Sequence, residues 1–387
     1  MAETWNVRVL GHSDLGGSGD GMHVALRGDL AFVGHMGETG TSILDVSDPA
    51  AVRLVARVPA SSDTHAHKVQ IQGDVMITNR ELIPRRTGPH EAGLAIHDIS
   101  DPAHPRQIGW WPCGGLGVHR MTWWDGSLAY VTAGDDAVEQ QFLVILDLSD
   151  PTRPREVGRY WVPGQHRAEP RDWTPDMRVK LHHAIVRDGL AYCGWWDRGL
   201  IVLDIREPGA IRPIGGLDLG PDVARAVHTF LPLPGRSVAV TTEERITDGC
   251  AGVAPNARLL DITDPTDPQI LSTLPVPGGD FCERGGRFGP HNVHEPKPGT
   301  LIDGSTVYLT YFNGGLRVFD VSDATAPVEI AAFVPDPPPG QATTQLNDVT
   351  VSEDGRIYVT DRLAGGMHIL ELTEGASAAR PQASGES

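Results

Sequence analysis

Short apolar runs that end in a polar turn recur along the chain. The clearest copy, from Leu143 to Pro151, reads Leu-Val-Ile-Leu-Asp-Leu-Ser-Asp-Pro. Four apolar residues rich in β-branched side chains are too few for a helix, so the run predicts a buried strand, and Asp-Pro predicts the turn that ends it. Six other segments follow the pattern, at 42–49, 94–102, 200–208, 259–265, 316–324 and 367–372. The chain is therefore expected to repeat one structural unit seven times.

An acidic residue marks the end of each apolar run, and successive markers are separated by roughly 50 to 60 residues, the period of a propeller blade with insertions. The markers are Asp45, Asp98, Asp147, Asp204, Asp261, Asp320 and, in the most divergent copy, Glu371. Each unit reads as a strand, a short turn, a second strand, the marker strand, the Asp-Pro turn and a fourth strand. The sequence therefore predicts an all-β, seven-bladed β-propeller with four antiparallel strands per blade.

These blades account for residues 1–372 as a single domain. Their expected ranges are 20–58, 64–113, 117–163, 180–219, 225–277, 289–334 and 344–372. Blade seven has no fourth strand of its own, so the N-terminal segment 5–10 is expected to be its outer strand and to close the ring, which removes an open sheet edge. Residues 373–387 have the composition of a disordered tail.

Long connections are predicted on one rim of the propeller only. They join second to third strands (79–93, 133–141, 242–257) or successive blades (163–179, 277–289, 335–345). Both kinds of connection emerge on the same face, as expected of a scaffold that carries a functional site. The alternative is neutral variation in loop length.

Charge and composition narrow the class of protein. The net charge of -18 argues against nucleic acid or an anionic membrane as partner. The chain contains no apolar run long enough to span a bilayer, and its first residues lack the features of a signal peptide, so a cytoplasmic location is expected. Because Cys113, Cys193, Cys250 and Cys282 form no CxxC motif, we predict reduced, buried thiols, with a disulfide as the less favoured alternative. The oligomeric state is not indicated.

Histidine recurs at the start of the first strand of most blades. When these starts are aligned on the apolar residue two places later, five blades carry histidine in one column, and the other two carry Met22 and Asn347. The column histidines are His67, His119, His182, His228 and His291. With 16 histidines in 387 residues, chance would give this on the order of one time in a hundred thousand. Because innermost strands surround the propeller axis, five imidazoles are expected to converge on one channel.

Converging imidazoles predict a metal site. Neutral imidazole is a common ligand of Fe, Cu, Mn and Zn, whereas a cluster of protonated histidines would repel itself. We predict one transition metal ion on the axis, held by three to five column histidines, with Fe(II) favoured and Cu, Mn or Zn following. The alternative is that each histidine bonds a backbone carbonyl around a water-filled pore.

Four further residues are predicted as alternative ligands or as partners of the ligands. His65 lies two residues before His67 and, in an extended strand, points the same way. His183 follows a column histidine and points to the opposite face, and His294 is three residues beyond His291. Glu81 is one of several carboxylates that can orient an imidazole N–H.

Three residues are predicted to act on the substrate. Arg120 follows a column histidine and can clamp a carboxylate or phenolate. Glu243 or Asp348 would carry a proton if the reaction needs one.

The repeated Leu/Ile-Val/Leu-Asp-x-Ser/Thr-Asp-Pro segments resemble those of the LVIVD-repeat β-propeller proteins, and the match extends from Met22 to Leu372 with departures at Arg206-Glu207 and Ala324. The resemblance implies the fold strongly and the reaction weakly. The axial histidines are also similar in arrangement to those of carotenoid-cleaving oxygenases, where four histidines hold ferrous iron. Copper-dependent methanethiol oxidases of the selenium-binding family and pectate-type lyases with manganese are further likenesses of architecture, without a shared motif.

The sequence thus favours a metal-dependent enzyme, foremost a non-haem iron or copper oxidoreductase that acts on a small organic molecule. One alternative is a non-redox lyase, hydratase or hydrolase in which the metal is a Lewis acid. The other is a non-catalytic interaction scaffold, for which an empty channel and functionally neutral His→Ala substitutions are expected.

Overall fold

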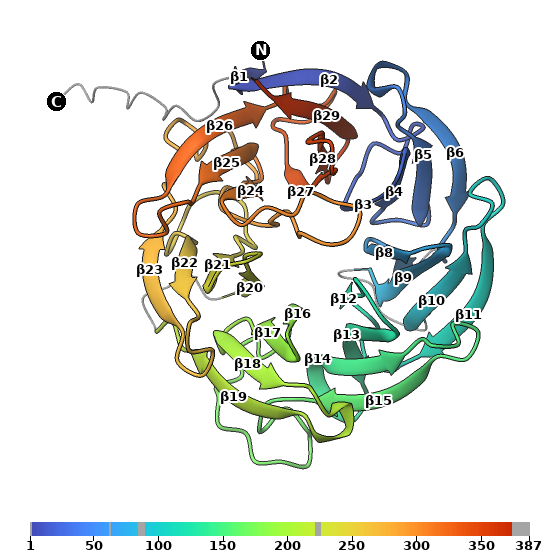
Figure 1. The fold of residues 1–387 in the computed structure, drawn as a ribbon, viewed down its shortest axis with the longest axis vertical. Coiled ribbons are helices and arrows are strands. Elements are labelled where there is room, and N and C mark those ends of the chain that lie inside the picture. Colours follow the sequence, from blue (N-terminus) through green and yellow to red (C-terminus); the bar gives the residue numbers. More distant parts are fainter. Residues whose placement is uncertain (1, 62, 84–89, 221–225, 374–387) are drawn as a thin grey trace.

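Seven small antiparallel sheets surround a central axis in the computed structural model (Figure 1). The structure describes the whole chain except residues 1, 62, 84–89, 221–225 and 374–387. Each sheet is one blade, and each blade has four antiparallel strands, to which blade two adds a short fifth. The predicted all-β, seven-bladed propeller is therefore confirmed. The tail that the composition predicts beyond residue 373 lies outside the described residues.

In the first three blades the strands follow one another from the axis outward. Blade one contains β3 (His23–Arg27), β4 (Leu30–Gly34), β5 (Thr41–Asp45) and β6 (Arg53–Val58), with a 3-10 turn at Pro49–Ala51. Blade two contains β8 (Val69–Gln72), β9 (Val75–Leu82), β10 (Gly93–Asp98) and β11 (Arg106–Pro112), and β7 (Thr64–His65) pairs with the end of β9. Blade three contains β12 (Arg120–Thr122), β13 (Leu128–Asp135), β14 (Val138–Asp147) and β15 (Arg155–Tyr160).

Blades four and five repeat this order. Blade four contains β16 (His183–Arg187), β17 (Leu190–Gly194), β18 (Leu200–Asp204) and β19 (Arg212–Leu217), with a 3-10 turn at Pro208–Ala210. Blade five contains β20 (Val227–Pro232), β21 (Val238–Glu243), β22 (Ala257–Asp261) and β23 (Gln269–Thr273).

The N-terminal segment contributes the outer strands of the last two blades. Blade six contains β24 (Thr306–Thr310), β25 (Leu316–Asp320), β26 (Val328–Val334) and β1 (Glu3–Trp5). Blade seven contains β27 (Leu346–Val351), β28 (Ile357–Asp361), β29 (Met367–Leu372) and β2 (Val7–Ser13). The antiparallel pairing of β2 with β29 closes the ring as the sequence predicts, whereas the pairing of β1 with β26 was not expected.

Blade six departs from the predicted strand order at the axis. The segment around His291 lies beside β24 and exchanges backbone hydrogen bonds with it, but it is not a regular strand. Pro290 and Pro296 flank this segment. Because proline has no backbone N–H to donate, a continuous ladder cannot form there.

The marker aspartates end the third strand of six blades by a common hydrogen bond. Asp147 Oδ1, for example, accepts from the backbone N–H of Ser149 at 2.8 Å, and its Oδ2 accepts from Arg155 at 2.5 Å. The short side chain thus replaces a backbone turn bond and fixes the direction in which the fourth strand returns.

Glycines on the outer strands allow successive blades to pack closely. A Cβ atom on Gly109 of blade two would lie 2.1 Å from the carbonyl oxygen of Pro151 in blade three, and one on Gly158 would lie 1.9 Å from that of Pro208 in blade four. The proline of the turn after the third strand of blades three and four therefore docks on the preceding blade where only glycine fits.

Two of the four cysteines form a disulfide, which corrects the prediction of reduced thiols. Cys250 and Cys282 lie 5.5 Å apart between Cα atoms, whereas Cys113 and Cys193 are free. The sequence placed the bonded pair in separate insertions, 242–257 and 277–289, but the fold brings these loops together. Disulfides are typical of oxidising compartments, so this one argues against the expected cytoplasmic location, which stays a prediction.

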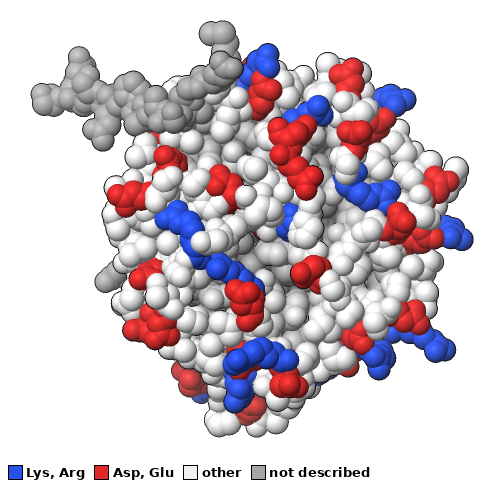
Figure 2. Space-filling view, viewed as in Figure 1, with Lys and Arg blue, Asp and Glu red and all other residues white. Residues whose placement is uncertain are grey.

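Acidic and basic side chains are interspersed over the face shown in Figure 2. Within the described part of the chain, no helix is long and apolar enough to cross a membrane.

Candidate metal centre

The five column histidines form a continuous arc of imidazole rings at the propeller axis. Successive ring centroids lie 5.1 Å apart for His67 and His119, 4.9 Å for His119 and His182, 3.5 Å for His182 and His228, and 4.6 Å for His228 and His291. The residues come from five blades; four of them lie at or beside the start of an innermost strand, and His291 lies in the segment that runs beside β24. The radial repeat therefore brings together side chains that are far apart in sequence.

All five imidazoles are held in the neutral form. Burial lowers the pKa of each below its usual 6.5, and the charges of neighbouring groups lower it further at His67, His182, His228 and His291. At His119 burial outweighs the opposite effect of the Glu81 carboxylate on the pKa. A neutral imidazole keeps one nitrogen lone pair, which metal ligation requires.

Backbone carbonyls fix the tautomers of two column histidines. Nδ1 of His182 lies 2.9 Å from the carbonyl oxygen of His228, and Nδ1 of His291 lies 2.8 Å from that of Asn347. Because a carbonyl oxygen only accepts, each Nδ1 carries the proton. Nε2 therefore has the free lone pair, as a metal ligand needs.

A carboxylate fixes the tautomer of a third column histidine, His119. Nδ1 of His119 lies 2.8 Å from Oε2 of Glu81, and Oε1 of the same carboxylate accepts from Nε2 of Gln141 at 2.6 Å. This arrangement is that of a carboxylate–histidine–metal triad, in which the acid orients the ring and raises its basicity. Glu81 also lies 3.0 Å from Nε2 of His65.

The other two column histidines differ from one another. Nδ1 of His228 lies 2.9 Å from the hydroxyl of Thr229, which can either donate or accept. Nδ1 of His67 lies 3.1 Å from Nδ2 of Asn79, an amide whose orientation is fixed because its Oδ1 accepts from the backbone of Lys68. The amide therefore donates to His67, whose proton resides on Nε2. His67 fits the ligand role less well than the other four.

Pairs of neighbouring rings have the spacing expected of ligands of one ion, but the groupings of three residues whose ligand atoms all lie within 4.8 Å of one another include neither His119 nor His182 among the described residues. With a metal–nitrogen bond of about 2.1 Å, an imidazole centroid lies about 3.2 Å from the ion, so ligands at 90–109° are about 4.5–5.2 Å apart. The spacings from His119 to His182 and from His228 to His291 fall in this range. The rings of His182 and His228, at 3.5 Å, would have to separate by about 1 Å.

Carboxylates complete a metal-ligand grouping near each end of the arc. The ligand atoms of His65, His67 and Glu81 lie within 4.8 Å of one another, and so do those of His228, His291 and Glu244. Oε1 of Glu244 lies 3.7 Å from Nε2 of His291. The described residues can therefore hold a metal ion, and the geometry does not identify which one.

Glu244 is one of the several carboxylates that the sequence offers as partners of the imidazoles, but the proton-carrier role was predicted for its neighbour Glu243. The fully buried Glu243 carboxylate pairs with Arg258 and accepts from the backbone N–H of Asn256 at 3.2 Å. Successive residues at the end of a strand point to opposite sides, and the sequence does not reveal which side faces the axis. The proton-carrier role of Glu243 stays a prediction.

A cavity of about 350 Å³ opens at the end of the arc that contains His67 and His119. It reaches His65, His67, His119 and Glu81, and most of its surface is apolar. The remaining lining residues are Met22, Met36, Leu82, Ile83, Leu116, Lys180 and Arg362. Of the predicted long connections, only 79–93 contributes to this lining, through Glu81, Leu82 and Ile83.

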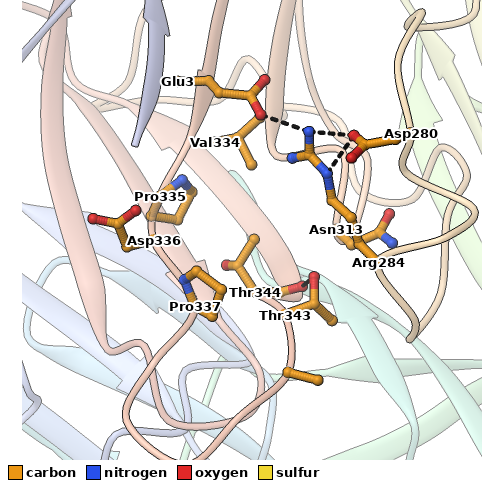
Figure 3. A pocket seen from close by; sticks show the side chains of 11 residues that line it. Glu3, Asp280, Arg284, Asn313, Val334, Pro335, Asp336, Pro337, Thr343 and Thr344 are labelled. Atoms are coloured by element: carbon orange, nitrogen blue, oxygen red, sulfur yellow. Dashed lines mark hydrogen bonds and ion pairs between the residues drawn. The ribbon is translucent and has the colours of Figure 1, made fainter. Parts of the chain in front are cut away.

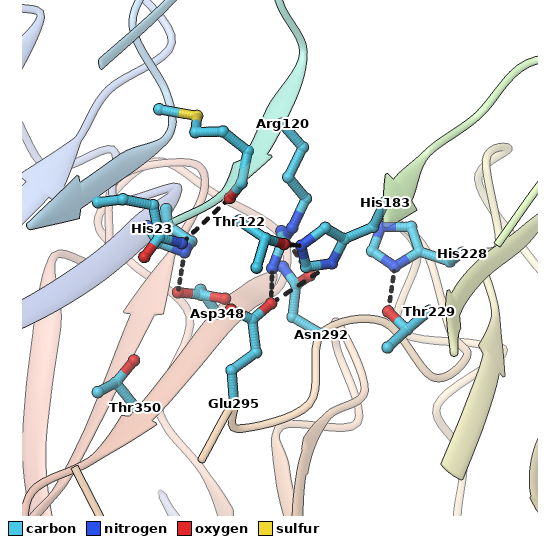
Figure 4. Close-up of polar contacts among 12 residues, drawn as sticks. His23, Arg120, Thr122, His183, His228, Thr229, Asn292, Glu295, Asp348 and Thr350 are labelled. Atoms are coloured by element: carbon cyan, nitrogen blue, oxygen red, sulfur yellow. Dashed lines mark hydrogen bonds and ion pairs between the residues drawn. The ribbon is translucent and has the colours of Figure 1, made fainter. Parts of the chain in front are cut away.

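The residues that come one position after the column residues in sequence, such as Arg120 and His183, form a second layer of polar side chains (Figure 4). Arg120 donates to Oε1 of Glu295 at 2.5 Å and to Oδ1 of Asn292 at 3.2 Å, which commits two of its nitrogens within the protein. His183 lies 2.8 Å from the hydroxyl of Thr122 through Nε2. The predicted substrate contact of Arg120 and the predicted ligand role of His183 stay predictions, and both side chains lie in this layer.

Asp348 lies in the same layer. Its Oδ2 accepts from the backbone N–H of Val24 at 2.9 Å and lies 4.0 Å from Nε2 of His23. Burial raises the pKa of Asp348 above its ordinary value. A raised pKa suits a carboxyl group that exchanges a proton, the role predicted for this residue.

His294 lies away from the arc of imidazoles. Its Nε2 lies 2.9 Å from the carbonyl oxygen of Leu301, and its Nδ1 accepts from the backbone N–H of Val351 at 3.2 Å. Both ring nitrogens are thus engaged by backbone groups.

A separate cavity of about 300 Å³ lies beside the N-terminal strand (Figure 3). Arg284 in its wall is paired with Asp280 at 2.5 Å and with Glu3 at 2.7 Å. The guanidinium charge of Arg284 is therefore already neutralised, and the column histidines are not among the residues that line this cavity.

The repeat unit matches a known family model. The model of the LVIVD repeat matches residues 18–59, 89–110, 125–162 and 301–334, which confirms the predicted resemblance. A comparison with curated proteins found no match.

Several solved structures have the same fold. A hypothetical selenium-binding protein from Sulfolobus tokodaii is 16% identical with a TM-score of 0.60, over 88% of this chain and 84% of that one. Sqt1 of Chaetomium thermophilum, bound to the N-terminus of ribosomal protein L10, is 13% identical with a TM-score of 0.58, over 92% and 84%. The computationally designed Ika8 protein is 12% identical with a TM-score of 0.52, over 93% and 89%. At these identities the likeness is one of fold alone.

Proposed function

We propose that this protein is a metal-dependent oxidoreductase that binds one iron or copper ion at the propeller axis and acts on a small organic molecule. The ligands in this proposal are the Nε2 atoms of His119, His182, His228 and His291. The observation that carries it is the hydrogen bonding of Nδ1, because three of these rings have an acceptor at Nδ1 and therefore a lone pair at Nε2.

The carboxylates favour iron over the other metals. His228, His291 and Glu244 form a grouping of two histidines and one carboxylate, the donor set of many non-haem Fe(II) oxygenases. A thioether favours copper instead, since Met36 Sδ lies 3.2 Å from Nδ1 of His65. Iron is placed first because the carboxylate of Glu244 lies beside two of the proposed ligands, whereas Met36 contacts His65, which is not one of them.

The protein side chains have distinct tasks in this proposal. Glu81 orients His119, and the apolar walls of the cavity exclude water from the reacting molecule. Asp348 carries the proton if the reaction needs one, since its pKa is raised by burial. When bound, the ion supplies redox chemistry that these residues lack.

Metal analysis tests the proposal. Protein purified without a histidine tag from iron- or copper-supplemented cultures is expected to hold about one ion per chain, and His119→Ala and His228→Ala are expected to hold less than about half of that. His104→Ala is the matched control, because His104 is exposed on the outside of blade two and pairs with Asp101. An ion content below about half per chain that neither substitution changes would refute the site.

Activity assays separate this proposal from its alternatives. An oxidoreductase loses activity when its electron acceptor is removed, whereas a lyase, hydratase or hydrolase keeps it. A scaffold without chemistry would tolerate both histidine substitutions in any assay of its binding.

A further inference from the structure

The cavity at the end of the histidine arc contains two cations that are not hydrogen-bonded within the described part of the protein. Lys180 and Arg362 both line it, and their charges meet no carboxylate in an ion pair there. Each is instead placed by an aromatic ring, with Lys180 Nζ 3.9 Å from the centroid of Trp196 and the guanidinium carbon of Arg362 5.8 Å from that of Phe312. An aromatic face holds a cation and leaves its N–H donors free.

Other cations near this site are already paired. Arg287 donates to Glu244 at 2.9 Å, and Arg178 contacts Asp197 at 3.2 Å. Lys180 and Arg362 are therefore lining cations without an ion-pair partner within 4.0 Å among the described residues, and Glu81 and Glu244 act on their charges only from beyond that distance. Both are partly buried, and burial lowers the pKa of Arg362 to about 10 without removing its charge at neutral pH.

Apart from Glu81 and the three histidines, the remaining walls are apolar. Met22, Met36, Leu82, Ile83 and Leu116 line the cavity, and Leu116 is 47% exposed at its edge. Methionine and leucine side chains favour an apolar ligand body and offer it no hydrogen bond. A volume of about 350 Å³ accommodates a molecule of roughly ten to fifteen non-hydrogen atoms.

We infer that the substrate is a small molecule with an apolar body and one anionic group, and that Lys180 and Arg362 hold the anionic group while the body lies against Met22, Met36 and Leu116. This inference deepens the proposed function, on which it rests, by naming the class of substrate. A protein of net charge -18 repels anions at long range, so a local pair of cations is needed to select one.

Phenylacetate and its neutral isostere phenylacetamide test this class. The two probes have the same size and the same apolar ring, so a difference in their affinity reports the charge alone. Isothermal titration calorimetry on the chelator-treated protein is expected to show phenylacetate binding at least tenfold more tightly than phenylacetamide. Because no metal is present, the readout does not depend on activity.

Substitutions assign the charge effect to the two cations. Lys180→Met and Arg362→Gln are each expected to lower the affinity for phenylacetate at least tenfold, and to keep the affinity for phenylacetamide within about threefold of the wild-type value. Arg53→Gln is the control, since it removes the same charge from an exposed position on the outer strand of blade one. Three results would each overturn the inference. The first is equal affinity of the wild type for the two probes, and the second is equal loss of affinity for both probes in the variants. The third is that neither probe binds at about 10 mM to chelator-treated or metal-loaded protein.

The same variants distinguish failure of this inference from failure of the proposed function. Metal content is measured on each, and Lys180→Met is expected to keep the wild-type content. If the wild type binds no metal but discriminates between the probes, the proposed function fails and the anionic class stands. If metal binds and the probes are not discriminated, only the substrate class fails.

Discussion

Replacement of Glu81 by glutamine probes the orientation of the ligand His119 without changing the size of the side chain. In the native protein one carboxylate oxygen accepts from Gln141 at 2.6 Å, and the other accepts from Nδ1 of His119 at 2.8 Å. A glutamine at position 81 has only one acceptor oxygen. Either Gln141 or His119 must therefore face an NH₂ group.

The expected magnitude follows from this conflict. If the amide oxygen stays with Gln141, the NH₂ group faces His119, whose Nδ1 then has to accept and whose proton moves to Nε2. His119 then presents an N–H to the axis instead of a lone pair and cannot ligate. Loss of such an orienting partner costs about 10- to 100-fold in metal affinity, or about 1.4–2.7 kcal/mol. We expect the upper end for Glu81→Gln, because His65 loses the same partner.

Competition with a chromophoric chelator measures the affinity directly. The protein is stripped, and the dissociation constant of Co²⁺ or anaerobic Fe²⁺ is determined for wild type and Glu81→Gln. Glu371→Gln is the control, because this glutamate pairs with Arg8 on the outside of blade seven. Urea unfolding of the metal-free proteins shows whether the substituted chain is folded.

A folded Glu81→Gln protein whose dissociation constant stays within threefold of the wild type would refute the reasoning. In that case His119 either is not a ligand or takes its orientation from another group. A comparable loss of affinity in Glu371→Gln would show that charge at a distance, rather than the tautomer of His119, sets the affinity.

Three further predictions concern stability. Cys250→Ser is expected to lower the free energy of unfolding by about 3.7 kcal/mol, because the disulfide closes a loop with a sequence separation of 32. A loss below about 1 kcal/mol, measured by urea unfolding, would contradict this. Acidification from about pH 7.5 to about pH 5.5 is expected to cost about 1.4 kcal/mol for each of His67, His182, His228 and His291, because burial holds their pKa values well below 6.5 in the folded state and only the unfolded chain gains protons over this range. A flat stability profile would argue against buried neutral imidazoles. Gly109→Ala is expected to cost about 1–3 kcal/mol because its Cβ would meet the carbonyl of Pro151, whereas Gly209→Ala, with its nearest neighbour at 4.0 Å, should be nearly neutral in the same assay.

The repeat carried most of the information about the fold. A short β-branched run followed by Asp-Pro dictates a strand and a turn by local chemistry, so seven copies determined seven blades. The missing outer strand of blade seven also determined the closure by β2, because an unpaired edge is unfavourable. The additional pairing of β1 with β26 was not predictable, since three residues at a chain terminus carry too weak a pattern.

The sequence by itself also determined the ring of histidines, because equivalent positions in a radial repeat must converge on the axis. It did not determine which nitrogen of each ring faces the axis, since that depends on partners such as Glu81 and the carbonyl of Asn347, which lie in other strands or blades. The choice of Glu244 over Glu243, the disulfide between Cys250 and Cys282, and the presence of Lys180 and Arg362 in the wall of one cavity are likewise properties of the closed ring. These contacts join residues on loops whose paths no local periodicity fixes, so only the tertiary structure could decide them.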